Sequence, residues 1–432
     1  MRERTEEVPG AGCRVLSAVL GLPAGALAKA GAVCRVLGAL LLSAAAASAQ
    51  VAVRGDTVHT MAGAPIKDGV VLVGKDGKIE RVGPASSVRI PTGYKLLRAK
   101  VVTPGLVDAH SVVGLSGYLN QPHDQMQLEN SAAIQPELRA IDAYNARETL
   151  VEWLRIHGVT TVHTGHAPGA LVPGQTMVVK TRGDEVEQAV IVPLASVAAT
   201  LGTGGLAGTG KSPGNRSKAV AMLRAELIKA KEYVDKQKGP EDKRPARDLK
   251  LETLGKVLSK DVPMLVTANR ANDILTALRI AKEFDLRIIL DSAAEAYLVT
   301  DQIKAADVPV ILHATMSRAG GDSENMSMES AALLRKAGIL VALQSGYETY
   351  VPKTRVVLFE AAIAAANGLT FDQALATVTI DAAKIIGVDK RVGALEAGKD
   401  GDLVLFDGDP FEYVTHVIGV VIDGVVVSET PQ

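Results

Sequence analysis

A histidine follows an apolar run in the segment TPGLVDAHSVVGLSG, which spans Thr103 to Gly117. The run Leu106–Ala109 is typical of a buried strand, and His110 stands where the strand would open into a cleft. A metal site there favours a second histidine two residues on, because side chains at i and i+2 of a strand point to the same side. Val112 occupies that position, so the spacing leaves open whether the chain holds a metal.

Further histidines lie at or just after apolar runs. Imidazole is a common transition-metal ligand and an acid or base near neutral pH, although a single histidine more often satisfies a local hydrogen bond. The chain has eight histidines, and five stand in such places: His110, His163, His166, His313 and, in the loop after the first run, His123. Because His163 and His166 are three residues apart, both can face one site only if the chain turns at Gly165.

A long polar loop follows the first apolar run. Pro122 and Pro136 bracket it, and no helix or strand pattern is clear until about residue 140. Long irregular loops often shape substrate pockets, and the alternative is a packed surface loop. Its amide side chains would suit a small substrate with amide or carboxylate groups. The expected substrate-binding residues are Tyr118, Asn120, Gln121 and Asp124, together with Asn269 after a later run.

The stretch GLAGTGKS, Gly205 to Ser212, fits the spacing of a phosphate-binding loop. Such a loop must run from a buried strand directly into a helix whose amides face the phosphates. Here Pro213 and Gly214 follow at once, and the preceding residues form a poor strand pattern. The context therefore favours a flexible glycine-rich loop over a nucleotide site.

Apolar runs alternate with helical patterns through the middle of the chain. Helices are predicted over 143–157, 271–284 and 328–337. Eight strands alternating with helices predict a (β/α)₈ barrel, whose active site lies at the carboxyl ends of the strands. The runs are Leu106–His110, Val159–His163, Thr176–Lys180, Ala189–Pro193, Met264–Thr267, Arg287–Asp291, Pro309–His313 and Ile339–Gln344.

Short strands and turns occupy both ends of the chain after the leader. This texture predicts one small β-sandwich domain formed by residues 50–103 and 389–432 around a barrel of residues 104–388. Residues 201–250 interrupt the barrel pattern with glycine-rich sequence and a charged helix over 217–236. Between Lys211 and Lys250 there are twelve Lys and Arg against six Asp and Glu, which indicates a solvated helix or, alternatively, a lid or partner-binding insertion.

Residues 1–49 read as a signal peptide. An arginine, Arg35, precedes a short apolar stretch, and Ala47-Ser48-Ala49 before Gln50 matches a secretory cleavage site. The stretch is short for a membrane span. Both cysteines, Cys13 and Cys34, lie in this leader, so the mature chain would have neither disulfides nor thiolate ligands. We expect an exported protein, periplasmic or secreted.

The composition excludes several classes of partner. The 432 residues carry a formal net charge of −1, which gives no general attraction to nucleic acid or anionic membranes. We expect a small-molecule substrate, no nucleic acid and no membrane association after cleavage. A homo-oligomer is left open.

The segments "TPGLVDAH" and "VGALEAGKDGDLVLFDGDPFEY", with the strand series between them, resemble the amidohydrolase superfamily in its imidazolonepropionase-like branch. The resemblance implies a metal-dependent (β/α)₈ barrel with a β-sandwich from both termini. It also implies hydrolysis of amides, cyclic amides, ureas and related C–N bonds. In that chemistry a metal lowers the pKa of its bound water to about 7. An aspartate at the end of the eighth strand moves the proton to the leaving nitrogen.

The chain departs from the ligand pattern of that family. Only His110 matches, and valine and glycine offer no lone pair to a metal, so the usual binuclear site is not expected. The other positions hold Val112 in the first strand, Thr267 or Asn269 at the fifth, Ser292 at the sixth and Gly346 in place of the eighth-strand aspartate.

Two readings follow from this departure. In the first, a rebuilt site hydrolyses a C–N bond of a small amide or cyclic amide, with His163, His166, Asp291 and His313 as catalytic residues. His110 and His123 would then hold one zinc or other divalent metal, and Asp291, Asp124 or Glu348 would supply a carboxylate. In the second, the protein is a catalytically inactive relative that binds a small molecule or serves as a scaffold. The persistence of polar residues at the strand ends favours the enzyme.

Overall fold

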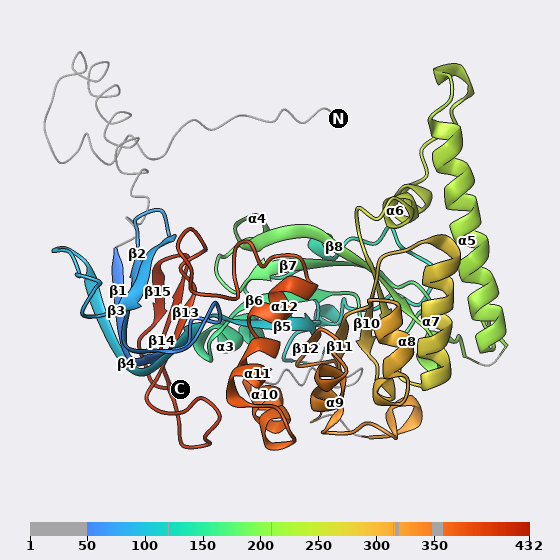
Figure 1. Cartoon of the computed structure of the whole chain (residues 1–432). Coiled ribbons are helices and arrows are strands. Elements are labelled where there is room, and N and C mark those ends of the chain that lie inside the picture. Colours follow the sequence, from blue (N-terminus) through green and yellow to red (C-terminus); the bar gives the residue numbers. More distant parts are fainter. Residues whose placement is uncertain (1–49, 120, 209, 314, 316–318, 348–356) are drawn as a thin grey trace, which may run out of the picture. The chain divides into compact units, whose positions relative to one another are not determined.

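The computed structural model describes residues 50–119, 121–208, 210–313, 315, 319–347 and 357–432. Two sheets organise them: a seven-stranded sheet from both ends of the described chain, and an eight-stranded sheet from its middle (Figure 1). In these described ranges, every helix is too short or too polar to cross a bilayer. The predicted signal peptide, residues 1–49, lies outside the described residues.

The seven-stranded sheet joins segments from opposite ends of the chain. Its order is β15-β14-β13-β4-β1-β2-β3, and β13 pairs with β4 in antiparallel register from Leu403 opposite Pro104 to Phe406 opposite Val101. The prediction of a composite domain from both termini is thus confirmed. The bounds are β1 Val51–Val58, β2 Ile66–Val73, β3 Ile79–Pro84, β4 Lys95–Pro104, β13 Leu403–Phe406, β14 Val417–Ile422 and β15 Val425–Ser428.

The eight-stranded sheet forms the predicted barrel. Its strands follow chain order from β5 to β12, and a bridge between Ser111 and Gly346 brings the first strand to the last. Each strand lies at one of the predicted apolar runs. The bounds are β5 Leu106–Ser111, β6 Val159–Gly165, β7 Gly174–Lys180, β8 Val190–Thr200, β9 Met264–Thr267, β10 Ile288–Ser292, β11 Val310–Leu312 and β12 Val341–Leu343.

One strand runs against the expected direction. β7 pairs antiparallel with both β6 and β8, whereas the other neighbouring pairs of this sheet are parallel. The link from β6 to β7 is too short for a crossover helix, so the chain turns back at once. Lys180, which the runs place at a strand end, therefore lies at the opposite face from His110. The fourth strand also continues beyond Pro193 to Thr200.

Helices cover the outside of the barrel, and their apolar faces complete the core. The predicted helix 271–284 is found as α7, and the insertion helix is α5, which buries Leu223, Leu227 and Tyr233 on one side. The helix bounds are α3 Thr149–Ile156, α4 Val186–Ala189, α5 Arg216–Gln237, α6 Leu249–Leu258, α7 Ala271–Phe284, α8 Thr300–Ala305, α9 Ser330–Lys336, α10 Val357–Ala366, α11 Phe371–Thr377 and α12 Ile380–Ile385. Short 3-10 turns are η2 Pro122–Asp124, η3 Ala140–Asp142, η4 Thr203–Gly205, η5 Glu241–Lys243, η6 Ala296–Leu298 and η7 Gly321–Ser323.

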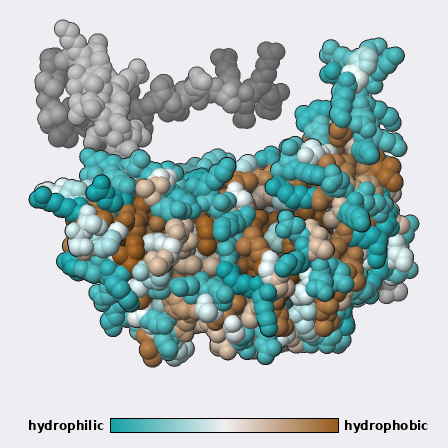
Figure 2. Space-filling view, viewed as in Figure 1, coloured by the Kyte–Doolittle hydropathy of each residue, from teal (hydrophilic) through white to brown (hydrophobic). Residues whose placement is uncertain are grey.

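The opposite side of α5 is solvated. Figure 2 shows hydrophilic surface over the end of the helix that projects from the body of the barrel domain. Its lysines form ion pairs within the insertion, such as Lys229 with Glu226 and Lys238 with Asp235. These contacts agree with a helix that packs by one apolar face and keeps its charges in water.

The barrel interior is apolar at the end away from the candidate site. Inward side chains of the strands, such as Val107, Leu265 and Ile311, pack against Ala382 and Ile386 of the α12 region. This packing closes one end of the barrel. The chemistry must therefore lie at the other end, where the polar residues are.

Candidate active site

The centre of the candidate site is a hydrogen bond across the barrel interior. His110 Nδ1 lies 2.7 Å from Asp291 Oδ1, and the two side chains are buried, at 1% and 0% exposure. β5 and β10 are separated by β11 and β12 around the barrel, so the two side chains must both point inward to meet. A break in the register between Asp108 and Ser111 accompanies His110, and such bulges re-aim side chains.

Neighbouring strands hold Asp291 in place. Thr267 Oγ1 at the end of β9 donates to its Oδ2 at 2.6 Å, and Gln344 Nε2 after β12 donates to its Oδ1 at 3.0 Å. Burial raises the pKa of Asp291, but the His110 charge and these hydrogen bonds outweigh it, and the net pKa is lowered. The carboxylate is therefore ionised and fixed in one orientation.

One ring nitrogen of His110 is available to bind a substrate or ligand. Because Nδ1 donates to Asp291, Nε2 is left, and it is buried without a hydrogen-bond partner among the described residues. Burial lowers the pKa of His110, but Asp291 more than compensates and the net pKa is raised. A buried polar nitrogen without a partner costs about 1–3 kcal/mol, so such atoms mark places that a substrate or ligand satisfies.

His163 lies beside His110, with ring centroids 5.7 Å apart, but its nitrogens are already used. Nδ1 donates to the Ala109 carbonyl at 2.7 Å, and Nε2 accepts from Thr176 Oγ1 at 2.7 Å. Burial and the His110 charge lower the pKa of His163 to about 3. The ring is therefore neutral. Since both nitrogens are hydrogen-bonded to the protein, its role is to pack beside His110 and not to transfer a proton.

An acidic residue that the sequence analysis did not select also lies in this region. Asp108 is fully buried on β5 and accepts from the Ser345 backbone at 3.1 Å and from the Ser345 hydroxyl. Burial raises its pKa to about 6. These bonds join β5 to the segment after β12. The available signal was an aspartate inside an apolar run, which must find a partner when buried.

The other candidate catalytic histidines lie near the strand ends in different surroundings. His166 is buried just after β6, against Gly174, and both ring nitrogens lack a partner among the described residues. His313 follows β11, where its backbone N–H donates to the Ser292 carbonyl at 2.7 Å. The structure shows no contact that joins His166 to the His110–Asp291 pair.

Several residues of the predicted substrate-binding loop are exposed, unlike the buried His110–Asp291 pair. Tyr118, Gln121 and His123 are exposed, and Asp124 serves its own turn by accepting from the Gln121 backbone at 2.7 Å. The structure shows no contact between His123 and the buried His110. Asn269 links the segments after β9 and β10, since its Oδ1 accepts from the Ala294 backbone at 3.3 Å. Asn120 and Glu348 lie outside the described residues.

The donor set does not fit a bound metal. Over the described ranges, no group of three or more His, Cys, Asp or Glu side chains is placed to hold a metal ion. Of the four ring nitrogens of His110 and His163, only His110 Nε2 has no protein partner among the described residues. Thr267 bonds to Asp291, and the Gly346 backbone pairs with Ser111, so neither position adds a metal-binding side chain.

The sequence and fold of the chain are similar to those of known amidohydrolases. The model of the Amidohydrolase family matches residues 284–427. The crystal structure of an amidohydrolase from Thermotoga maritima MSB8 has a TM-score of 0.82 and 30% identity, and the match covers 88% of this chain and all of that one.

Two curated relatives are more distant in sequence. An imidazolonepropionase from Brucella anthropi is 24% identical, over 86% of this chain and 94% of its own length. The amidohydrolase tasK of Hapsidospora irregularis is 25% identical over 82% of this chain, which spans only 39% of that protein. The chain therefore belongs to the amidohydrolase superfamily, a family of hydrolases that act on carbon–nitrogen bonds.

Proposed function

We propose that this protein hydrolyses a C–N bond of a small amide or cyclic amide with a rebuilt site centred on His110 and Asp291. The observation that carries the proposal is the buried His110 Nε2, which has no partner among the described residues while Nδ1 is held by Asp291. Members of the family typically use divalent metals such as zinc. The described side chains here do not fit such an ion, so no step is assigned to one.

The pair can supply acid–base chemistry by itself. Asp291 fixes the ring orientation of His110 and stabilises its charged form, which is why the pKa of His110 is raised despite burial. Nε2 can then take a proton from an attacking water and return it to the leaving nitrogen, the role that a positioned histidine has in general acid–base catalysis. Thr267 and Gln344 act as positioning residues, because they bind the carboxylate and not the reacting atoms.

The test is hydrolysis of a panel of N-acyl amino acids, lactams and hydantoins by the purified protein. We expect His110→Asn and Asp291→Asn to lower kcat by about 100-fold or more, the usual size of a general acid–base contribution. His416→Asn, which alters an exposed histidine in the loop before β14, is the matched control and should leave kcat unchanged.

Metal analysis of the same preparations separates the remaining alternatives. About one equivalent of zinc that is lost in His110→Ala would contradict the metal-free pair and support a reduced metal site. If the protein binds members of the panel but hydrolyses none of them, the result would contradict the proposed enzymatic function and support a binding protein.

A further inference from the structure

A cavity lies on the same face of the barrel as the candidate site. Its volume is about 450 Å³, and three segments line it: residues 130–133 after β5, 169–171 after β6, and 205–208 with 211–213 after β8. These three strands run in one direction, so the segments that follow them emerge at the carboxyl ends, as His110 and Asp291 do. Leu171 ties the cavity wall to the barrel, because its carbonyl accepts from Thr200 at the end of β8 at 3.0 Å.

The cavity offers a positive charge and a side-chain amide to a ligand. Its polar lining side chains are Asn130, Ser131, Lys211 and Ser212, and no aspartate or glutamate is among the described residues that line it. The two hydroxyl groups already have protein partners, because Ser131 Oγ donates to Gln135 at 3.2 Å and Ser212 Oγ donates to the Met222 sulfur at 3.4 Å. The nearby Glu129 carboxylate accepts from the Ser131 backbone N–H at 2.6 Å. The Lys211 ammonium and the Asn130 amide are therefore the groups that would attract an anion.

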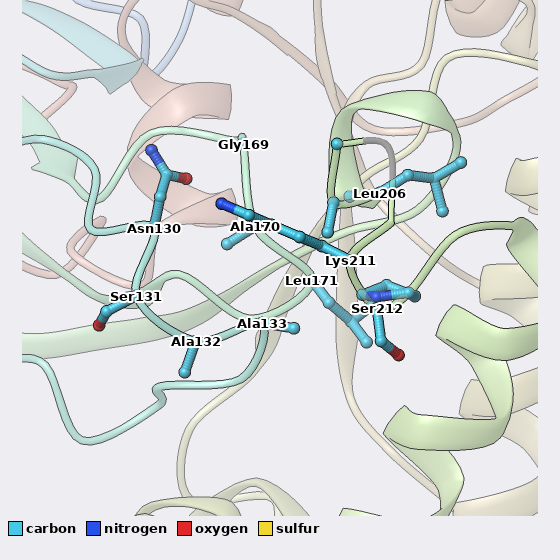
Figure 3. A pocket seen from close by; sticks show the side chains of 14 residues that line it. Asn130, Ser131, Ala132, Ala133, Gly169, Ala170, Leu171, Leu206, Lys211 and Ser212 are labelled. Carbon is cyan, nitrogen blue, oxygen red and sulfur yellow. The ribbon is translucent and has the colours of Figure 1, made fainter.

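Lys211 supplies the charge. Its side chain stretches across the cavity, with the ammonium toward the side where Ala170 and Asn130 lie (Figure 3). In the described part of the chain, this ammonium has no ion-pair or hydrogen-bond partner. The next cation along the chain, Arg216, is by contrast paired with Asp273. Lys211 is thus available to a ligand.

The surrounding backbone allows a close approach. Gly208 forms part of the cavity wall, and a Cβ added there would meet nothing within 4 Å. The segment does not continue into α5, which begins only at Arg216, so the arrangement is not a helix-terminal phosphate loop. A small oxyanion suits this site better than a nucleotide.

We propose that this cavity binds the anionic group of the substrate, a carboxylate or a phosphate, and that Lys211 neutralises its charge. The inference rests on the proposed function, since it assigns the substrate class of that site. The substrate would place its C–N bond at the His110–Asp291 pair and its oxyanion beside Lys211.

Anion binding can be measured without any hydrolysis. Acetate and inorganic phosphate are titrated into the purified wild type, Lys211→Met and Lys218→Met, and binding is followed by chemical-shift changes. We expect Lys211→Met to weaken binding about tenfold, the effect of losing one charge-assisted hydrogen bond. Lys218→Met, which alters an exposed lysine in the first turn of α5, should bind like the wild type. The stronger of the two probes identifies the anion. Equal binding by Lys211→Met, or no binding by the wild type, would overturn the proposal.

Kinetics then connect the cavity to the reaction. For an amide substrate with a carboxylate, Lys211→Met should raise KM about tenfold with little change in kcat, and Lys211→Arg should restore KM. The same substrate with its carboxylate converted to a neutral amide should not respond to Lys211→Met. If anion binding depends on Lys211 but the protein hydrolyses no substrate, the proposed function is wrong and the anion site still stands.

Discussion

His110 and His163 are neighbours whose pKa values shift in opposite directions. Asp291 supports the charged form of His110 and raises its pKa, whereas burial and, after it, the His110 charge lower the pKa of His163. Two imidazoles in one buried site thus have separate roles: one is available for proton transfer, and the other is a neutral support.

The buried neutral His163 makes stability depend on pH. Its pKa is about 3 in the folded protein and 6.5 in the unfolded chain, so its contribution is full above pH 6.5 and is lost as pH falls toward 3. At pH 4.5 this loss is about 3 kcal/mol. We expect urea unfolding at pH 7.5 and 4.5 to show a smaller stability difference in His163→Asn than in the wild type.

The control for that experiment is His416→Asn, because His416 is exposed. It should retain the wild-type pH dependence. A His163→Asn protein with an unchanged difference between the two pH values would show that His163 is not buried in its neutral form.

Thr267 provides a test of positioning at the same scale. Thr267→Val keeps the shape but removes the donor to Asp291 Oδ2, so the carboxylate is held less firmly. We expect kcat to fall about tenfold with KM nearly unchanged, and the pH profile of kcat to shift, because the His110 environment changes. Thr267→Ser should restore both, and a Thr267→Val enzyme with wild-type kcat and pH profile would contradict the role.

At the scale of elements, the reversed strand β7 explains a buried cluster of charges. The Lys180 ammonium lies 2.5 Å from Asp402, 3.0 Å from Asp400 and 3.1 Å from Asp423, at the face of the barrel opposite to His110. These aspartates flank β13 and β14, so the lysine joins β7 of the barrel to the composite sheet. Its function is structural in this arrangement.

Removal of that charge should destabilise the protein strongly. Lys180→Met leaves buried carboxylates without their common partner, and we expect the free energy of unfolding to fall by about 3–5 kcal/mol. Denaturant unfolding checks this value. Lys75→Met, at an exposed turn, should change stability by less than about 0.5 kcal/mol. A small effect of Lys180→Met would mean that the cluster is solvated.

The insertion helix α5 depends on its first residues. Asn215 caps the helix, and its side chain accepts from the Lys218 N–H at 2.9 Å. Asn215→Ala should lower the free energy of unfolding by about 1 kcal/mol, measured by denaturant unfolding. Ser217 lies in the same turn, but Asn215 is the residue that caps it, so Ser217→Ala should have little effect. Equal losses in both variants would contradict a specific cap.

At the scale of the whole molecule, the chain is closed by strands from its two ends. β13 lies between β4 and β14 in the seven-stranded sheet, so residues 403–432 cannot be removed without exposing the edge of β4. We expect a chain that ends at residue 402 to lose cooperative thermal unfolding and to aggregate, because an open apolar edge pairs with other chains. Removal of Pro431 and Gln432 alone should preserve the cooperative transition.

Export is a further property of the whole chain, and it remains a prediction. If residues 1–49 are a signal peptide, the protein recovered after expression in a bacterial host will be periplasmic and begin at Gln50. N-terminal mass spectrometry checks the cleavage position. Replacement of Ala49 with aspartate should block processing, and recovery of an uncleaved cytoplasmic wild type would refute the prediction.

The strands of both sheets and the fold class could be predicted from local patterns in the chain. Apolar runs with polar ends predicted the barrel strands, and the tail around Asp402-Leu403-Val404 predicted the composite sheet, because local periodicity and turn residues act within a few positions. His110 could be singled out for the same reason, since it stands at the end of such a run.

Which of these residues come into contact could be seen only in the folded chain. Asp291 is 181 positions from His110, and the direction of β7 moved Lys180 to the other end of the barrel. The cavity beside Lys211 likewise unites segments that follow three different strands. Contacts of this kind depend on how distant segments pack and on which way each strand runs, and a local pattern records neither.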